Sequence, residues 1–206
     1  MRIGILLCGC GALDGTDPHE AILSMAEIQR LGHDAICIAA DRPQLHVVNH
    51  ATFLEIPDKT RSQYDESSRL SYGKLFNIID ISPKMIDALL IPGGQGAVKN
   101  LMAGFGVLSE QRQVYPDVAK FIEEVSAASG KIGAIGLAEF VVTELFGPWP
   151  SGKNCMEIGP DEIITNEGRG VAATPGALQC TNLAQMQAGI SKLIEHLTHP
   201  KVSSHQ

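Results

Sequence analysis

The feature that most constrains the fold is a small-residue apolar run that ends in a glycine-marked turn. Residues 130–136 read Gly-Lys-Ile-Gly-Ala-Ile-Gly, and an amphipathic segment over 141–146 follows closely. This order predicts a buried strand, a sharp turn and a helix, the arrangement on which α/β enzymes often display a nucleophile. The turn residue is Gly136, which has no side chain and cannot attack a substrate. Any function assigned to the chain must therefore account for an elbow without a nucleophile.

The N-terminal segments predict a strand-helix-strand unit. Residues 2–8 form a continuous apolar run, which is typical of a strand buried on both faces of a parallel sheet. Apolar residues at helical spacing over 21–31, closed by Gly32, predict a helix, and residues 34–40 predict a second strand. Together with another apolar strand at 87–91, this order predicts an α/β fold, a doubly wound and mostly parallel sheet flanked by helices.

The remaining elements follow the same alternation. Helices are predicted over 62–71, 97–103, 115–128 and 181–197, and strands over 44–50, 161–165 and 170–174. The helix at 62–71 is expected to be polar and exposed, and Lys99 and Asn100 are expected to be solvated or to cap their helix. Residues 148–152 predict a turn and not a linker, so we expect one domain over 1–206 with a frayed polar tail from His199.

Composition excludes several classes of partner. The net charge is −7 and Lys and Arg do not cluster, so neither nucleic acid nor an anionic membrane is expected as a partner. We expect no signal peptide and no membrane span. Five cysteines without framework spacing predict reduced thiols and a cytoplasmic location. The histidines and cysteines have no metal-ligand spacing, so no metal and no cofactor are expected.

Residues 17–20, which read Asp-Pro-His-Glu, have two interpretations. In the first, which the sequence alone favours, Asp17 caps a helix, Pro18 occupies its first position and Glu20 returns a bond as in a capping box. In the second, Glu20 points across the carboxyl edge of the sheet toward the elbow. Both can hold, because the ends of parallel strands gather at that edge.

Two glycine-rich turns are further candidates. Gly9–Gly15 approaches a dinucleotide fingerprint but lacks its spacing, so a loop that needs positive φ is preferred over nucleotide binding. Cys10 lies in this loop at the end of the first strand. One interpretation places it near Glu20, and the preferred one is inert packing, as is usual for a free buried cysteine. The turn at 92–94, Pro-Gly-Gly, can supply N–H groups to an oxyanion hole or simply join a strand to a helix.

Three blocks of the chain resemble a known family. They are Gly-Cys-Gly…Asp-Gly…His-Glu-Ala over 9–21, Val-Val-Asn-His over 47–50, and Pro-Gly-Gly-x-Gly-Ala-x-Lys-Asn-Leu over 92–101. By these motifs the chain is similar to the ElbB-type family of the DJ-1/PfpI superfamily. The resemblance implies a flavodoxin-like, class I glutamine amidotransferase-like sandwich. It covers residues 1 to about 146 and resumes from Val171 through the last helix.

The resemblance also implies a three-part site. In the superfamily a cysteine at the elbow is assisted by a glutamate on the first helix and by backbone N–H groups after a Pro-Gly-Gly turn. By position the cysteine falls on Gly136 and the glutamate on Glu20. The implied oxyanion donors are Gly94 and Leu137, with Gly93 in the same turn.

The chain departs from the family at the elbow. Leu137-Ala138-Glu139 stands where the family usually has Ile-Ala-Pro, and Cys155 is the nearest remnant of a second group near the site. The family is linked to glyoxalase-like hydration of small dicarbonyls and, by name, to isoprenoid biosynthesis. That chemistry needs a thiolate, so loss of the cysteine indicates an impaired or non-catalytic homologue that keeps the fold, a small-molecule pocket and a homodimer.

Two other functions stay open at this point, and with them whether the chain is an enzyme at all. It can be an active glyoxalase-like or other small-carbonyl enzyme in which Cys10, or a water activated by Glu20, replaces the missing thiol. It can instead bind a dinucleotide or phosphate through the Gly9–Gly15 loop.

Overall fold

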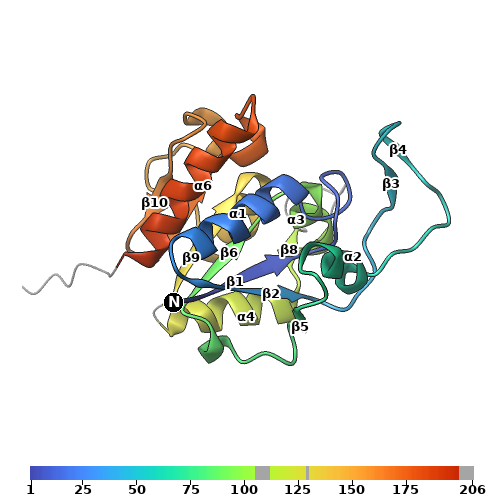
Figure 1. The fold of residues 1–206 in the computed structure, drawn as a ribbon, viewed down its shortest axis with the longest axis horizontal. Helices are drawn as coiled ribbons and strands as arrows, with labels where there is room; N and C mark the ends of the chain where they lie inside the picture. The colour runs from blue at the N-terminus through green and yellow to red at the C-terminus, as the bar shows by residue number, and fades with distance from the viewer. Residues whose placement is uncertain (105–111, 129, 200–206) are drawn as a thin grey trace, which may run out of the picture.

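The computed structural model describes residues 1–104, 112–128 and 130–199 (Figure 1). The helices are α1 (Pro18–Arg30), α2 (Gln63–Leu70), α3 (Gln95–Asn100), α4 (Pro116–Ala127), α5 (Glu139–Phe146) and α6 (Leu183–Thr198). The strands are β1 (Arg2–Leu7), β2 (Asp34–Ala39), β3 (Val48–Asn49), β4 (Leu54–Glu55), β5 (Leu75–Asn77), β6 (Ala88–Ile91), β7 (Met102–Ala103), β8 (Gln113–Val114), β9 (Lys131–Ile135), β10 (Ile164–Asn166) and β11 (Val171–Thr174). Short 3-10 turns lie at Pro83–Met85, Gly136–Ala138, Cys155–Glu157 and Gly176–Leu178. From residue 200, the predicted frayed tail lies outside the described residues.

A seven-stranded sheet organises the molecule. Its order is β10-β11-β9-β6-β1-β2-β5, and every neighbouring pair is parallel except β10 with β11. The chain moves outward from β1 to β2 and β5 and then returns to the other side of β1 with β6. This reversal creates a switch point between β1 and β6, where α/β proteins generally bind ligands. The predicted doubly wound α/β sheet is confirmed.

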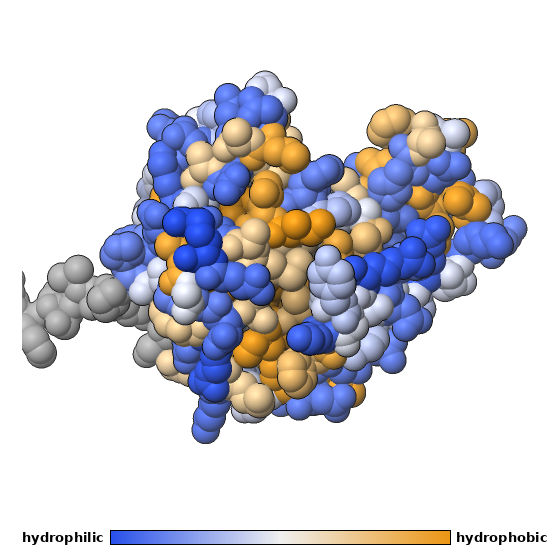
Figure 2. Space-filling view, in the orientation of Figure 1, coloured by the Kyte–Doolittle hydropathy of each residue, from blue (hydrophilic) through white to orange (hydrophobic). Residues whose placement is uncertain are grey.

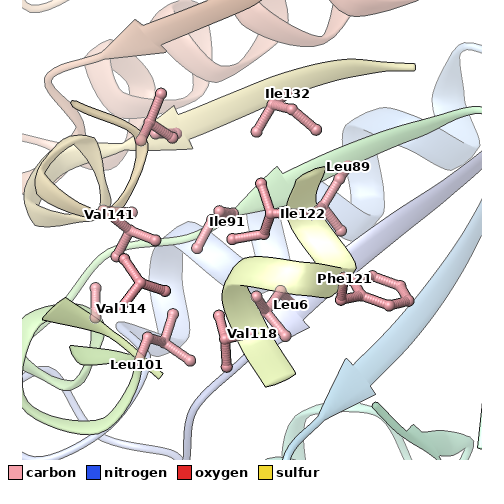
Figure 3. Close-up of a cluster of buried hydrophobic side chains, with 14 of the residues drawn as sticks. Leu6, Leu89, Ile91, Leu101, Val114, Val118, Phe121, Ile122, Ile132 and Val141 are labelled. Carbon is pink, nitrogen blue, oxygen red and sulfur yellow. The ribbon is translucent and has the colours of Figure 1, made fainter. Parts of the chain in front are cut away.

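Helices cover both faces of this sheet (Figure 1). Side chains alternate along β1: Leu6 joins one apolar cluster, whereas Ile5 and Leu7 join the other. The first cluster includes residues of α4 and α5, and Figure 3 shows Phe121, Ile122 and Val141 among its members. The second cluster packs against α1 and α6. Both faces of the central strands are therefore buried, which explains why β1 reads as an unbroken apolar run.

The ends of α1 follow the predicted chemistry. The carboxylate of Asp17 accepts hydrogen bonds from the backbone N–H groups of His19 at 2.8 Å and Glu20 at 3.3 Å, and Pro18 occupies the first position. At the other end, Gly32 has φ +77° and donates its N–H to the Gln29 carbonyl. These two signals fix where α1 begins and ends.

Several predicted elements differ from the observed ones. The helix expected over 97–103 ends at Asn100, because Met102–Ala103 pairs with Gln113–Val114 as a two-stranded ribbon. The strand expected over 44–50 is reduced to Val48–Asn49, which pairs with Leu54–Glu55 in a ribbon that projects from the body of the molecule (Figure 1).

The helix at 62–71 was expected to be exposed, but α2 has a buried side. Gln63, Ser67 and Leu70 are all buried there, and the hydroxyl of Ser67 accepts the backbone N–H of Gly9 at 2.9 Å. The polar residues on this side pack against the backbone of loops. A search for apolar periodicity in the sequence therefore did not predict that this side is buried.

Candidate functional site

The ends of four adjacent strands converge at the carboxyl edge of the sheet. The segments that follow β1, β6, β9 and β11 all meet there, and these strands are consecutive in the sheet order. The segments bring together Glu20 at the start of α1, the turn at 92–94, the elbow at Gly136 and the turn at Gly176–Leu178. This is the edge at which the sequence predicted a site.

The elbow has the strained backbone of a nucleophile-bearing turn but no nucleophile. Gly136 has φ +54°, a conformation that residues with side chains adopt rarely. A Cβ atom placed there would lie 3.3 Å from Oε1 of Glu20 and 3.3 Å from the carbonyl oxygen of Pro175. Both contacts are tight, so a side chain at this position would require its neighbours to shift by a few tenths of an ångström. The glycine thus opens a space directly beside the Glu20 carboxylate.

Glu20 is buried, with 1% of its surface exposed, and both of its carboxylate oxygens are held by backbone. Oε2 accepts the N–H of Gly93 at 2.6 Å, and Oε1 accepts the N–H of Ala177 at 2.9 Å. The predicted capping box is therefore wrong in its second half: the N–H of Asp17 donates to the Gly93 carbonyl instead of to Glu20. The alternative interpretation, in which Glu20 points toward the elbow, matches this geometry.

Burial raises the pKa of Glu20 to about 7. The nearby charge of Asp17 also raises this pKa, while the N–H groups of Ala177 and Gly93 lower it. A carboxyl group with such a pKa can donate or accept a proton near neutral pH.

Glycines let the backbone approach the Glu20 carboxylate. A Cβ atom on Gly176, which has φ +52°, would lie 2.3 Å from Oε1 of Glu20. A Cβ atom on Gly93 would lie 2.9 Å from Oε2 and 2.5 Å from the carbonyl oxygen of Ile135. Neither position can hold a larger residue without displacing its neighbours.

A cavity of about 140 Å³ lies above Gly136. It is lined by Ala12, Asp17, Glu20, Gly94, Gln95, Gly136, Leu137, Ala177 and Leu178. The implied oxyanion residues Gly94 and Leu137 are both in this wall, but the N–H of Gly93 is occupied by Glu20. Two of these lining residues, Asp17 and Glu20, are acidic. Among the described residues, the lining contains no Lys, Arg or His. Its chemistry favours a small ligand without negative charge.

Cys10 does not line this cavity. The residue is partly buried and forms an isolated bridge with Thr16. Burial raises its pKa, the carboxylate of Glu66 raises it further, and Arg69 lowers it. The expected proximity of Cys10 to Glu20 therefore does not bring its thiol into the site, and the thiol lacks the depressed pKa of a reactive cysteine.

The Gly9–Gly15 loop uses its N–H groups internally. Gly11 donates to the carbonyl of Thr16 at 2.9 Å, and Gly15 donates to that of Gly11 at 2.7 Å. Gly9 and Gly11 have φ values of +108° and +140°, as expected for a loop that needs positive φ. A phosphate site needs free N–H groups at a helix start, and these are engaged elsewhere.

Two side chains that were expected to be solvated hold this loop in place. Asn100 is buried, and its amide donates to the carbonyl oxygens of Cys8 and Asp14, each at 2.8 Å. The ammonium of Lys99, also largely buried, donates to the carbonyl of Leu13 at 2.9 Å. Polar residues on a short helix gave no sign of this role, because their partners are backbone carbonyls distant in the sequence.

The turn at Gly176–Leu178 was not recognised as part of the site. Its N–H at Ala177 binds Glu20, and Leu178 forms part of the cavity wall. The only signal available was the family resemblance that resumes at Val171 and continues through the last helix, which includes this turn.

Cys155 is fully buried, and its backbone N–H donates to Oε2 of Glu139 at 2.9 Å. Burial and the charge of Glu139 raise the pKa of its thiol, so it is not a reactive group. Among the residues that the structure describes, no cluster of three His, Cys, Asp or Glu side chains could hold a metal ion. Within the same ranges, no helix is both long enough and apolar enough to cross a membrane.

No family model matches the chain, but individual proteins do. It is 28% identical over 219 residues to a mitochondrial ES1 protein homolog from Rattus norvegicus. This alignment covers 94% of this chain and 82% of the relative. It is 27% identical over 218 residues to the mitochondrial glutamine amidotransferase-like class 1 domain-containing protein 3 of Homo sapiens. This alignment covers 94% of this chain and 81% of the relative.

Solved structures share the fold. An isoprenoid biosynthesis protein with an amidotransferase-like domain from Ehrlichia chaffeensis superposes with a TM-score of 0.87 at 23% identity, over 96% of this chain and 98% of that one. A DJ-1 mutant from Schizosaccharomyces pombe superposes with a TM-score of 0.57 at 15% identity, over 97% and 93%.

The sheet order, the elbow after β9 and these relatives agree with one another. The chain belongs to the DJ-1/PfpI superfamily and has its class I glutamine amidotransferase-like fold.

Proposed function

We propose that the protein is an ElbB-like member of the superfamily in which thiol-dependent chemistry at the elbow is lost. The observation that carries this proposal is Gly136, which keeps the strained turn beside Glu20 but has no side chain. Glyoxalase-like chemistry needs a thiolate that adds to an aldehyde. Removal of a nucleophile usually lowers the rate by several orders of magnitude.

The cavity above Gly136 is proposed to remain a small-molecule pocket. Its volume of about 140 Å³ suits a molecule of a few heavy atoms. A hydrogen-bond donor on the ligand would meet Oε1 of Glu20 and the carbonyl oxygen of Pro175, which both face the space that a side chain at position 136 would fill. Gly94 and Leu137 lie in the same wall and offer backbone N–H groups to an oxygen of the ligand.

A glyoxalase assay with methylglyoxal tests the proposal. The wild-type protein is expected to give no turnover above the uncatalysed background. Gly136→Cys is the matched variant, because it places a thiol where a Cβ has contacts of 3.3 Å or longer. Substantial wild-type turnover that Glu20→Ala abolishes would refute the loss of activity.

A second candidate function uses Glu20 with water. Its pKa of about 7 suits a general base, and a water beside Oε1 would occupy the space left by the missing side chain. This version is favoured over one that uses Cys10, since that thiol does not line the cavity and its pKa is raised. Activity toward a small carbonyl compound that persists in Cys10→Ser but disappears in Glu20→Gln would support it.

We further propose that residues 1–206 form one domain that assembles as a homodimer in the cytoplasm. Apolar residues gather on the face that carries α1 (Figure 2), where Ile22 and Tyr72 are 53% and 95% exposed beside a groove of about 540 Å³. A second copy would cover this surface. Light scattering is expected to give a dimer that Ile22→Glu weakens, and a monomeric wild type would contradict the proposal. The curated relatives are named mitochondrial, so fractionation should compare both compartments.

A further inference from the structure

A second cavity, separate from the one above Gly136, lies beside the segment that follows α5. It has a volume of about 240 Å³ and shares no lining residue with the cavity above Gly136. It is lined by Glu139, Phe140, Thr143, Pro148, Trp149, Gly152, Lys153 and Asn154. One wall is the first turn of α5, and the other is the turn at 148–154.

The turn at 148–154 is held in place by hydrogen bonds. The side chain of Asn154 accepts the N–H of Met156 at 2.8 Å, and the carboxylate of Glu157 accepts the N–H of Asn154 at 2.9 Å. This capping box fixes the chain just after the cavity, so its wall is preformed.

The carboxylate of Glu139 is the charged group of this cavity. The residue is only 2% exposed, and its Oε2 accepts the indole N–H of Trp149 at 3.3 Å and the backbone N–H of Cys155 at 2.9 Å. Both donors are neutral. The thiol of Cys155 is a further neutral hydrogen-bond partner of this carboxylate, and within the described ranges no cationic side chain lies within 4.0 Å of it. A buried negative charge without a cationic partner is unfavourable, so a ligand that brings a positive charge would gain from binding here.

The rest of the lining favours an organic cation over a metal ion. Trp149 and Phe140 contribute aromatic groups, and aromatic rings attract alkylammonium groups through their π systems. One carboxylate alone offers too few oxygen ligands for Ca²⁺ or Mg²⁺. Lys153 also lines the cavity, but it is exposed. Its ammonium group would repel a bound cation.

We propose that this cavity binds a small alkylammonium ligand, with its charge against Glu139 and its methyl groups against Trp149 and Phe140. The cavity of about 240 Å³ is large enough for a group the size of trimethylammonium. The proposal is independent of the function assigned to Glu20, because the two cavities share no lining residue.

The indole of Trp149 provides a direct readout, since it is the one tryptophan of the chain and lines the cavity. Choline is the probe, titrated against tryptophan fluorescence and by calorimetry. Its neutral isostere 3,3-dimethyl-1-butanol tests whether charge is required. Choline is expected to bind and the isostere to bind at least about tenfold more weakly.

Three variants sharpen the test. Glu139→Gln keeps an oxygen for the N–H groups of Trp149 and Cys155 but removes the charge, and should weaken choline binding about tenfold or more. Glu144→Gln, which removes an exposed carboxylate from the same helix, should leave binding within about twofold. Lys153→Ala should strengthen binding about twofold to fivefold, and less so in high salt.

Each possible result decides the matter. Binding that depends on Glu139 and on the probe's charge supports the proposal. No fluorescence or heat signal at millimolar choline, or equal binding of choline and its isostere, would overturn it. So would choline affinity unchanged by Glu139→Gln. A thermal unfolding curve for each variant shows whether it is folded during these measurements.

Discussion

Two carboxylates are buried close to the same elbow, but their surroundings differ. Glu20 is 1% exposed, and each of its two carboxylate oxygens accepts one backbone N–H, from Gly93 and from Ala177. Glu139 is 2% exposed, its Oε2 accepts the N–H groups of Trp149 and Cys155, and the Cys155 thiol also hydrogen-bonds to its carboxylate. Glu20 is clamped by turns at the ends of β6 and β11, whereas Glu139 is held by buried residues of the segment that follows α5.

The difference indicates what each carboxylate is suited to do. Burial raises the pKa of Glu20 to about 7 even though the two N–H groups that clamp it lower this pKa, and such a pKa suits proton transfer or a hydrogen bond to a neutral ligand. The contacts of Glu139 are all with neutral donors, so its charge is suited to a ligand that carries a positive charge. The segment from Gly136 to Glu139 thus combines a position without a nucleophile beside Glu20 with a second buried carboxylate.

Glycine substitutions around Glu20 should give the largest effect on stability. Gly176→Ala places a Cβ 2.3 Å from Oε1 of Glu20 at φ +52°, so it should lower the free energy of unfolding by about 3–5 kcal/mol. Gly136→Ala is the control: its φ is similar, but its Cβ has contacts of 3.3 Å or longer, and about 1 kcal/mol is expected. Urea unfolding of both variants measures the difference. Equal losses would mean that the clamp around Glu20 is looser than described.

The pH dependence of stability should separate Glu20 from other acids. Its pKa is raised from 4.5 to about 7 in the folded protein, so its contribution to stability is fully present below pH 4.5 and is lost as pH rises through 7. A shift of this size corresponds to about 3 kcal/mol. Between pH 5 and pH 8, the wild type should therefore lose more unfolding free energy than Glu20→Gln, which cannot titrate at this position. Parallel losses in the two proteins would show that the pKa of Glu20 is not raised.

A smaller effect is expected at Glu139. Glu139→Ala leaves the N–H groups of Trp149 and Cys155 without their acceptor, and water in the adjacent cavity can replace it only in part. We expect a loss of about 2 kcal/mol in unfolding free energy, and less than about 1 kcal/mol for Glu139→Gln, which retains an acceptor. Chemical unfolding of the two variants checks this order. If the alanine and glutamine variants were equally stable, the two hydrogen bonds would contribute nothing.

The fold could be predicted from the sequence because its strands are buried on both faces. Apolar runs at 2–8 and 130–135, with Gly32 and Pro18 at the ends of a helix, are local signals, and the structure confirms the elements they predicted. The short strand β5 (Leu75–Asn77) was missed, because three residues at the sheet edge give little periodicity.

The site was harder to predict because its contacts join residues distant in the sequence. Glu20 looked like half of a capping box until the N–H groups of Gly93 and Ala177 were located beside it. Asn100 looked solvated, although its amide binds two loop carbonyls. Cys10 looked close to the site, but it does not line the cavity. Partners of this kind depend on how turns from different strands meet.

Thiol reactivity is the most direct test of whether the elbow has lost its nucleophile. Burial raises the pKa of each native thiol: Cys8, Cys10, Cys37, Cys155 and Cys180. Iodoacetamide at pH 7, with the labelled peptides identified by mass spectrometry, should therefore modify the folded wild type slowly at every cysteine. Gly136→Cys should add one thiol that reacts faster than all of these, because it stands at the start of a helical segment beside the cavity. A wild-type protein with a fast-reacting thiol, at Cys10 above all, would contradict the account.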